Sequence, residues 1–212
     1  MTSGGLAMMN LEQILLAVPS ILLAIAVHEY GHAYVAYKLG DPTPKYQGRL
    51  TLNPLAHLDP LGTIMLLLFR VGWARPVMIN TQYFKNKKQG TLLVSLAGPL
   101  ANVITAWIFY NIVSIFGTYM LRSAIGQPLI LFLYINVQMN LGLAAFNLIP
   151  IPPLDGSHVL ASLLPRSLSY RYAQLAPYGP IVLIGLLIFG GSRYIVNPIF
   201  NVLFRILDRL SL

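Results

Sequence analysis

The 212-residue sequence contains no cysteine. This absence excludes disulfide bonds, zinc sites built on thiolates and catalysis by a cysteine nucleophile. Charged residues are also scarce, at 9% of the chain against about 25% in a typical soluble domain, whereas 56% of the residues are hydrophobic. We therefore expect a mainly α-helical protein that crosses a membrane several times.

Acidic residues are the scarcest charged residues, since six Asp and Glu stand against 14 Lys and Arg, for a formal net charge of +8. In a soluble protein this excess would suggest nucleic-acid binding. In a membrane protein we interpret it as loop charge that faces an anionic lipid surface. We therefore expect the lipid bilayer as a partner and no nucleic acid. The first apolar stretch lacks a basic segment before it, so we expect it to be retained and not cleaved as a signal peptide.

Long apolar stretches predict the membrane-spanning helices, because a helix needs about 20 apolar residues to cross the hydrocarbon core. The first stretch ends at a Gly-Asp-Pro sequence that breaks helices. The predicted spanning segments are residues 11–39, 90–121, 128–149 and 175–189.

The C-terminal residues 194–212 place apolar side chains at helical spacing and predict an amphipathic helix at the membrane surface. We expect one domain over residues 1–212, with its core at about 11–190 and the interfacial helix at 191–212.

Three short segments lie between the first two predicted spans. Residues 61–69 are apolar but too few to cross the membrane, so they predict a short or re-entrant helix. Residues 47–52 and 77–83 alternate in polarity and predict small membrane-associated β-strands.

One polar motif stands inside the first predicted span. His28, Glu29 and His32 form an H-E-x-x-H pattern, and on a helix the two imidazoles project from one face. This spacing lets two neutral histidines bind a single Zn²⁺, with Glu29 beside them to take a proton from water. Such groups are costly to bury in an apolar helix, which favours a metal site over a chance match.

A catalytic zinc site has three protein ligands and one open position, so a third ligand is needed. Asp155 follows a proline-rich break at residues 150–153 within apolar sequence. We predict Asp155 as this ligand, because a carboxylate also offsets the charge of the ion; His158 is the alternative. A helix N-cap is a second role for Asp155. Asp41 and His57 are set aside because they lie in a polar turn and an interfacial loop.

Amide side chains line two of the predicted spans. Asn136, Asn140 and Asn147 fall on one face of their helix, and three amides in line cannot face lipid. We expect them to face the protein interior or a water-filled cavity. Asn102 in the preceding span also needs a partner, whereas Gly98 beside it is interpreted as a close-packing residue.

Two motifs match a known pattern in full: H-E-x-x-H at residues 28–32, and N-x-x-P-x-P-x-L-D-G at residues 147–156. The segment at residues 95–102 looks like a third landmark between them. Over roughly residues 15–160 the chain resembles the site-2 proteases, which are intramembrane zinc metalloproteases. It lacks the PDZ and CBS insertions of many relatives and looks like a minimal form.

The resemblance implies an enzyme that hydrolyses peptide bonds of single-span membrane proteins, in regulated intramembrane proteolysis. It implies Glu29 as the general base, and Asn140 and Asn147 as groups that bind the substrate backbone or stabilise the oxyanion. It also implies one Zn²⁺ per chain. The implied zinc ligands are His28, His32 and Asp155.

Two other functions are weighed against proteolysis. A membrane metal-ion transporter would also place His and Asp in apolar helices, but the adjacent Glu29 is a catalytic arrangement and no second intramembrane acid offers a relay. A non-catalytic scaffold of the same fold is disfavoured because Glu29 is intact.

The basic residues predict the orientation. Lys and Arg concentrate at residues 70–88 without any acid. By the positive-inside rule this connection faces the cytoplasm. We therefore expect an integral protein of a prokaryotic cell membrane with its catalytic motifs toward the cytoplasmic side.

Proteolysis inside a membrane also requires that a helical substrate unwinds, because helical hydrogen bonds shield the scissile carbonyl. The freed backbone groups then need partners. We hypothesise that a strand edge, at residues 47–52 or 77–83, clamps the unwound substrate by β-augmentation. The alternative is that the two strands only pair with each other.

Overall fold

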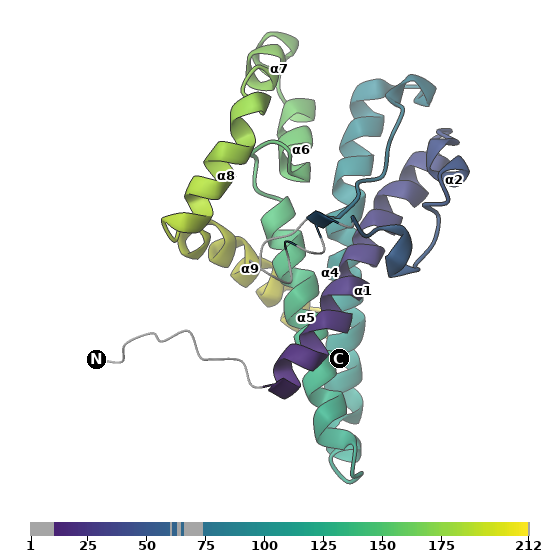
Figure 1. The fold of residues 1–212 in the computed structure, drawn as a ribbon, viewed down its shortest axis with the longest axis vertical. Coiled ribbons are helices and arrows are strands. Elements are labelled where there is room, and N and C mark those ends of the chain that lie inside the picture. Colours follow the sequence, from purple (N-terminus) through teal and green to yellow (C-terminus); the bar gives the residue numbers. More distant parts are fainter. Residues whose placement is uncertain (1–10, 60, 63–64, 66–73, 212) are drawn as a thin grey trace.

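The computed structural model describes residues 11–59, 61–62, 65 and 74–211. Three long helices pack against one another: α1 (Leu11–Lys38), α4 (Lys87–Met120) and α5 (Gly126–Asn147) (Figure 1). Within the described residues, four helical segments are long and apolar enough to cross a membrane. The mainly helical, membrane-spanning fold predicted from the composition is therefore confirmed.

The fourth of these segments, Arg166–Ile188, begins well before its predicted start at residue 175. It consists of α7 (Arg166–Ala173), the 3₁₀ turn η3 (Ala176–Tyr178) and α8 (Gly179–Ile188). The early start was not predicted because α7 carries several polar residues, so hydrophobicity alone does not reveal it.

Small residues let α1 and α4 approach closely. Ala26 and Ala33 on α1 are fully buried. A Cβ added to Gly31 would lie 2.7 Å from the carbonyl oxygen of Ala97, a distance that real Cβ atoms essentially never show. The glycine thus permits a backbone approach that any larger residue would prevent.

The chain after α5 forms an arm beside the upper end of α4. Residues 148–154 connect α5 to α6 (Asp155–Leu163), and α6 packs against α4. Figure 1 shows α7 above α6 and α8 descending from it. The proline-rich break therefore turns the chain so that α6 begins next to the middle of the three-helix group.

The C-terminal helix α9 (Ser192–Arg209) packs against α5 and α4, and its formation confirms the predicted helix. Two side-chain hydrogen bonds attach its end to α4. Trp107 Nε1–H donates to the Leu210 carbonyl at 3.1 Å, and the Tyr110 hydroxyl donates to Asp208 Oδ1 at 2.6 Å.

The two predicted β-strands are wrong. Residues 47–51 form turns and bends after the short helix α2 (Thr43–Tyr46), and residues 77–80 have no regular structure before the 3₁₀ turn η2 (Thr81–Tyr83). Among the described residues, β-pairing is limited to an isolated bridge between Leu58 and Ala74. For residues 77–80 the physical reason is that the N–H groups of Val77 and Asn80 donate to carboxylates, as described below. The predicted re-entrant segment, residues 61–69, lies mostly outside the described residues.

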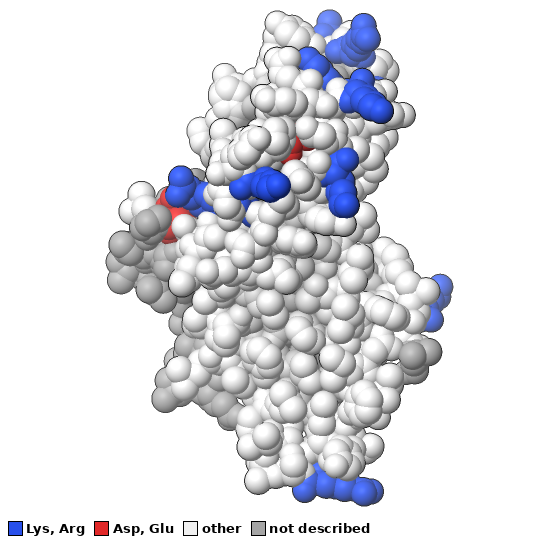
Figure 2. Space-filling view, turned by 90° about the vertical axis from the view of Figure 1, so that its right-hand side faces the viewer, with Lys and Arg blue, Asp and Glu red and all other residues white. Residues whose placement is uncertain are grey.

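Basic side chains are unevenly distributed over the surface. On the face in Figure 2, most Lys and Arg side chains lie in the upper half of the molecule, and the surface below is mostly white. The upper half contains α2 and the start of α4 (Figure 1). A largely uncharged belt with most of the basic residues toward one end is typical of a protein embedded in a bilayer.

Candidate metal centre

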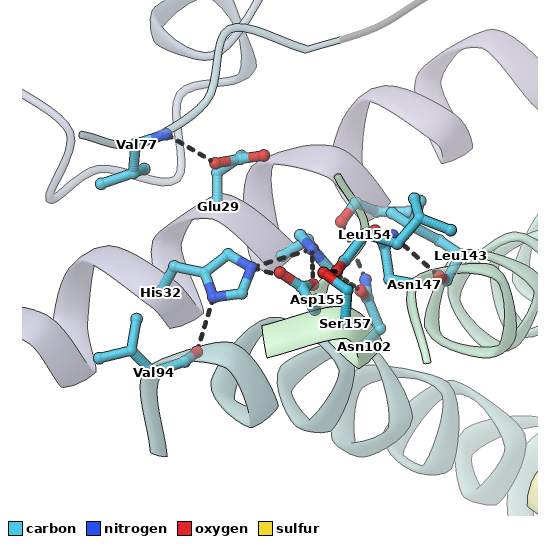
Figure 3. A network of polar contacts seen from close by, with 12 residues as sticks. Glu29, His32, Val77, Val94, Asn102, Leu143, Asn147, Leu154, Asp155 and Ser157 are labelled. Atoms are coloured by element: carbon cyan, nitrogen blue, oxygen red, sulfur yellow. Dashed lines mark hydrogen bonds and ion pairs between the residues drawn. The ribbon is translucent and has the colours of Figure 1, made fainter. Parts of the chain in front are cut away.

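Three side chains that could hold a metal ion converge where α1 meets the start of α6 (Figure 3). The Nε2 atoms of His28 and His32 lie 3.1 Å apart. Asp155 Oδ2 lies 3.1 Å from the first and 3.3 Å from the second. Zinc–ligand bonds of about 2.0–2.1 Å at tetrahedral angles place neighbouring ligand atoms about 3.3 Å apart. The three atoms therefore have the separations that one tetrahedral zinc ion requires.

The environment of these atoms also fits a metal. Both imidazoles are buried, and Asp155 Oδ2 is buried with no hydrogen-bond partner in the described residues apart from the two imidazoles. A buried carboxylate oxygen without donors is costly unless a cation satisfies it. Two imidazoles and one carboxylate form a donor set of catalytic zinc sites, which keep a fourth position open.

Asp155 is the first residue of α6 and does not cap that helix, since the N-cap is Leu154 and has no side-chain bond. The predicted capping role is wrong, and the carboxylate faces the histidines. His158, the alternative ligand, is exposed and lies outside the cluster. His57 is fully buried, and its Nε2 contacts the Thr51 carbonyl at 2.9 Å, also outside the cluster.

A hydrogen bond to Asn102 orients the His28 ring. His28 Nδ1 lies 2.7 Å from Asn102 Oδ1. The Asn102 amide is fixed because its Nδ2 donates to the Ala24 carbonyl and to Asn140 Oδ1, both at 2.9 Å. Its oxygen therefore faces the ring, so His28 Nδ1 carries the proton and Nε2 keeps its lone pair for a metal.

The backbone of α4 orients the second ring. His32 Nδ1–H donates to the Val94 carbonyl at 2.7 Å, which again leaves Nε2 free as a ligand. Gly98 lies against both rings, since an added Cβ would be 2.7 Å from His32 Cε1 and 2.8 Å from His28 Cε1. Gly98 is therefore more than a general close-packing residue, because it makes room for the two imidazoles.

A row of buried amides continues from Asn102 along the interior. Asn140 Nδ2 donates to the Asn136 carbonyl at 2.9 Å, and Asn136 Nδ2 donates to Ser20 Oγ at 2.8 Å. The four residues of this row, Asn102, Asn140, Asn136 and Ser20, are fully buried. The expectation that Asn136 and Asn140 face the interior is confirmed, and so is the need of Asn102 for a partner. The amide of Asn140 supports Asn102 and does not face an open space.

Asn147 differs from this row because it is only partly buried. It is the last residue of α5, and its Nδ2 donates to the Leu143 carbonyl at 3.0 Å. Figure 3 shows the side chain on the α5 side of Asp155. Since an amide nitrogen has two protons, Asn147 has a second donor for another group.

A segment that we call the strap, residues 77–80, runs beside Glu29 (Figure 3). The Val77 N–H donates to Glu29 Oε2 at 3.1 Å, and the Asn80 N–H donates to Asp41 Oδ2 at 2.7 Å. Two carboxylates, one on α1 and one just after it, therefore hold the strap over the end of α1 that carries the metal motif.

The role of Asp41 was not predicted from the sequence. The residue is fully buried, and its second oxygen accepts a hydrogen bond from the Thr43 N–H at 2.9 Å. Its sequence signal is only an acid between the Gly and Pro that end the first helix, which is also common in exposed turns. The distant partner Asn80 becomes visible only in the fold.

Positive charge lies close to Glu29 as well. Arg49 is buried and donates to the Ala56 carbonyl. Burial and the Arg75 guanidinium lower the pKa of Arg49, while the Glu29 carboxylate opposes that shift. Glu29 therefore has a backbone donor, and the positive charge of Arg49 is close enough to interact with it.

Comparison with known proteins identifies the protein family to which the chain belongs. The family model of Peptidase family M50 matches residues 16–128 and 111–187. The chain belongs to this family. The first matched range includes both histidines and the second includes Asp155, so both parts of the metal cluster lie within M50 sequence. The resemblance to site-2 proteases is thereby confirmed.

Individual relatives agree with the M50 assignment. YwhC of Bacillus subtilis (strain 168) is 41% identical over 184 residues, which cover 86% of this chain and 84% of YwhC. Rip2 of Mycobacterium tuberculosis (strain H37Rv) is 30% identical over 88% of this chain and 71% of its own length. Zinc metalloprotease MJ0392 of Methanocaldococcus jannaschii is 32% identical over 78% of this chain and 40% of its own length. No solved structure gives a match of comparable significance.

Membership of a peptidase family, with the candidate spanning helices and the metal-ligand cluster, supports a membrane metalloprotease.

Proposed function

We propose that the chain is a site-2-type intramembrane protease, which binds one Zn²⁺ and hydrolyses a peptide bond of a single-span membrane protein. One observation carries the proposal. His28 Nε2, His32 Nε2 and Asp155 Oδ2 meet at 3.1–3.3 Å, with Glu29 next in sequence to the first ligand. The name of MJ0392, a zinc metalloprotease, supports zinc as the ion.

The reaction is hydrolysis, in which water adds to the scissile carbonyl and the C–N bond breaks to give a carboxylic acid and an amine. Bound zinc would polarise that carbonyl and acidify the attacking water. Glu29 takes the proton from the water and passes it to the leaving amine. His28, His32 and Asp155 hold the ion, and their buried surroundings limit access of bulk water.

Asn147 is the proposed donor to the oxyanion or to the substrate backbone. Its partial exposure, its position beside Asp155 and its second amide proton suit this role. Asn140 was expected to share the role, but its amide is buried and hydrogen-bonded on both sides. We therefore propose a positioning role for Asn140, which acts through Asn102 on the His28 ring.

The substrate clamp is proposed for the strap alone. Residues 47–52 form turns and bends, which cannot offer a strand edge. The strap has no regular structure, and its Val77 N–H is bonded to Glu29. If the strap pairs with an unwound substrate through this N–H, the same step releases Glu29 for proton transfer.

We further propose that the catalytic motifs face the cytoplasm of a prokaryotic cell. The basic upper half in Figure 2 supports this orientation by the positive-inside rule. The relatives named above come from bacteria and an archaeon, which supports the type of cell.

The decisive experiment compares the wild-type protein with Glu29→Gln in proteoliposomes that contain single-span membrane proteins. The variant keeps the ligands and the size of the side chain, but an amide cannot take the proton. We expect a loss of cleavage of about 10²–10⁴-fold with an unchanged zinc content. Chelation should abolish cleavage by the wild type, and added zinc should restore it.

Zinc flux into the same proteoliposomes separates the transporter alternative. A transporter would move zinc at a rate that Glu29→Gln leaves intact and would not cleave any substrate. Cleavage by Glu29→Gln at the wild-type rate would contradict the proposed mechanism.

A further inference from the structure

A pocket of about 440 Å³ lies between the start of α4, α6 and α7, and none of the metal-site residues lines it. Figure 1 shows α6 and α7 beside the upper end of α4. We call it the basic pocket. Its polar lining includes Lys87, Lys88, His158, Arg166, Ser169 and Tyr170.

The charge of this lining is of one sign. Two lysines and one arginine contribute positive charge, His158 and four hydroxyl side chains add hydrogen-bonding groups, and no acidic residue among those that the structure describes lines the pocket. Lys88 Nζ donates to the Leu164 carbonyl at 3.2 Å, so one cation is held at the wall. Like charges this close repel one another unless an anion neutralises them.

The pocket also lies where two candidate spans begin. Lys87 is the first residue of the span Lys87–Met120, and Arg166 is the first residue of Arg166–Ile188. Residues at the ends of spanning helices lie at the level of the lipid headgroups. The pocket therefore opens where phosphate groups of the bilayer are concentrated.

We propose that the basic pocket binds the phosphate headgroup of an anionic phospholipid. Charge, hydroxyl donors and position all match this ligand, and basic pockets between spanning helices suit such headgroups. The apolar wall formed by Ala161, Leu164 and Ala173 faces the same space and suits the glycerol end of the lipid.

The bound lipid would also couple to the metal centre. The pocket joins α4, whose Val94, Gly98 and Asn102 contact the histidine rings, to α6, whose first residue is Asp155. A headgroup bonded to both helices fixes Asp155 relative to the two imidazoles. This coupling rests on the proposed protease function, whereas binding of the lipid does not.

The test is native mass spectrometry of the detergent-solubilised protein, titrated with phosphatidylglycerol or with phosphatidylcholine. A pocket variant and a control variant each lose three positive charges. The control residues are exposed and lie outside the pocket. The pocket variant is Lys87→Gln, Lys88→Gln and Arg166→Gln; the control is Lys45→Gln, Arg122→Gln and Arg171→Gln.

We expect the pocket variant to bind phosphatidylglycerol about a hundredfold more weakly, since each basic residue near an anionic lipid contributes about a factor of five. The control variant and all phosphatidylcholine titrations should change little. If the triple variant does not fold, the single variant Lys87→Gln at an exposed helix start should show about a fivefold loss.

Two soluble competitors identify the source of the anion. Displacement of the lipid by an equal concentration of glycerol 3-phosphate, or by polyglutamate, would overturn the proposal in favour of a free phosphate compound or an acidic peptide. Equal affinity of the pocket and control variants for phosphatidylglycerol would overturn it as well. Cleavage assays in vesicles of either lipid then test the coupling to the metal centre. Equal cleavage in the two kinds of vesicle would contradict the coupling and would leave the binding result unchanged.

Discussion

His28, Glu29 and His32 are neighbours on α1, yet the protein holds the imidazoles and the carboxylate in different ways. Each imidazole is buried and fixed by a group on the continuous helix α4, through Asn102 for one and the Val94 carbonyl for the other. Glu29 is only half-buried, and its carboxylate accepts a hydrogen bond from the Val77 N–H of the irregular strap.

The difference separates what must stay fixed from what must move. Metal ligands need orientations held by packing and by hydrogen bonds from supporting residues. A general base, the role that we propose for Glu29, has to exchange protons and to face its substrate. A helix supports the first requirement, and a non-helical segment held at two points supports the second.

Removal of a metal ligand should have the largest effect. Asp155→Ala leaves two protein ligands, so we expect the loss of zinc affinity to exceed the 10–100-fold that loss of a supporting group costs. His158→Ala removes an exposed imidazole from the same helix and should retain zinc. Zinc content after dialysis measures both variants. Zinc loss from His158→Ala alone would assign the third ligand to His158.

Removal of the group that supports His28 should have the next largest effect. Asn102→Leu keeps a similar volume but frees the imidazole to rotate, so we expect zinc affinity to fall about 10–100-fold. Thr105→Val is the matched control, because Thr105 is also on α4 and its hydroxyl donates to the Ala101 carbonyl in its own helix. Competition with a fluorescent chelator gives both affinities, and equal values would remove Asn102 from the site.

A methyl group placed against the rings should act more weakly. Gly98→Ala puts a Cβ within 2.8 Å of both imidazoles, at the lower end of the 1–3 kcal/mol that over-packing costs, or about a fivefold loss of zinc affinity. Gly117→Ala on the same helix has room and should instead stabilise the protein by about 0.4–1 kcal/mol. Zinc titration should therefore show a loss of affinity for Gly98→Ala, and thermal unfolding should show a gain of stability for Gly117→Ala.

Release of the strap should leave zinc binding unchanged. Asp41→Ala removes the acceptor of the Asn80 and Thr43 N–H groups, each such charged hydrogen bond contributing about 1.5–3 kcal/mol to the local structure. We expect faster amide exchange at residues 77–80 and a change in cleavage of a few fold. If Asp41→Ala instead lost zinc, the strap and the metal ligands would form one unit and the comparison would fail.

Much of the site could be predicted from the sequence because its spacing is local. The i, i+4 histidines share one helix face whatever surrounds them. The motif at residues 147–156 identified Asp155, and apolar length identified three spans to within a few residues. These features depend on helix geometry and on the cost of burying polar groups, which are properties of short segments.

The failures involve partners that are distant in sequence. Residues 77–83 have the alternation of a strand, but the carboxylates of Glu29 and Asp41 take the N–H groups that a neighbouring strand would need. Asn140 has the pattern of a substrate ligand, but its amide is fully buried and hydrogen-bonds to Asn102 and to its own helix. A pattern reports which residue types are present and does not report which acceptor each donor finds.

The sequence by itself determined the membrane-spanning helices, the histidine pair and the family, because these follow from hydrophobicity and from spacing within one helix. Only the tertiary structure decided which nitrogen of each histidine faces Asp155 in the candidate metal centre, since that depends on Asn102 and Val94 of another helix. It also decided that Gly98 makes room for the rings and that Asp41 anchors the strap. Packing of separate helices fixes these contacts, and no local pattern encodes them.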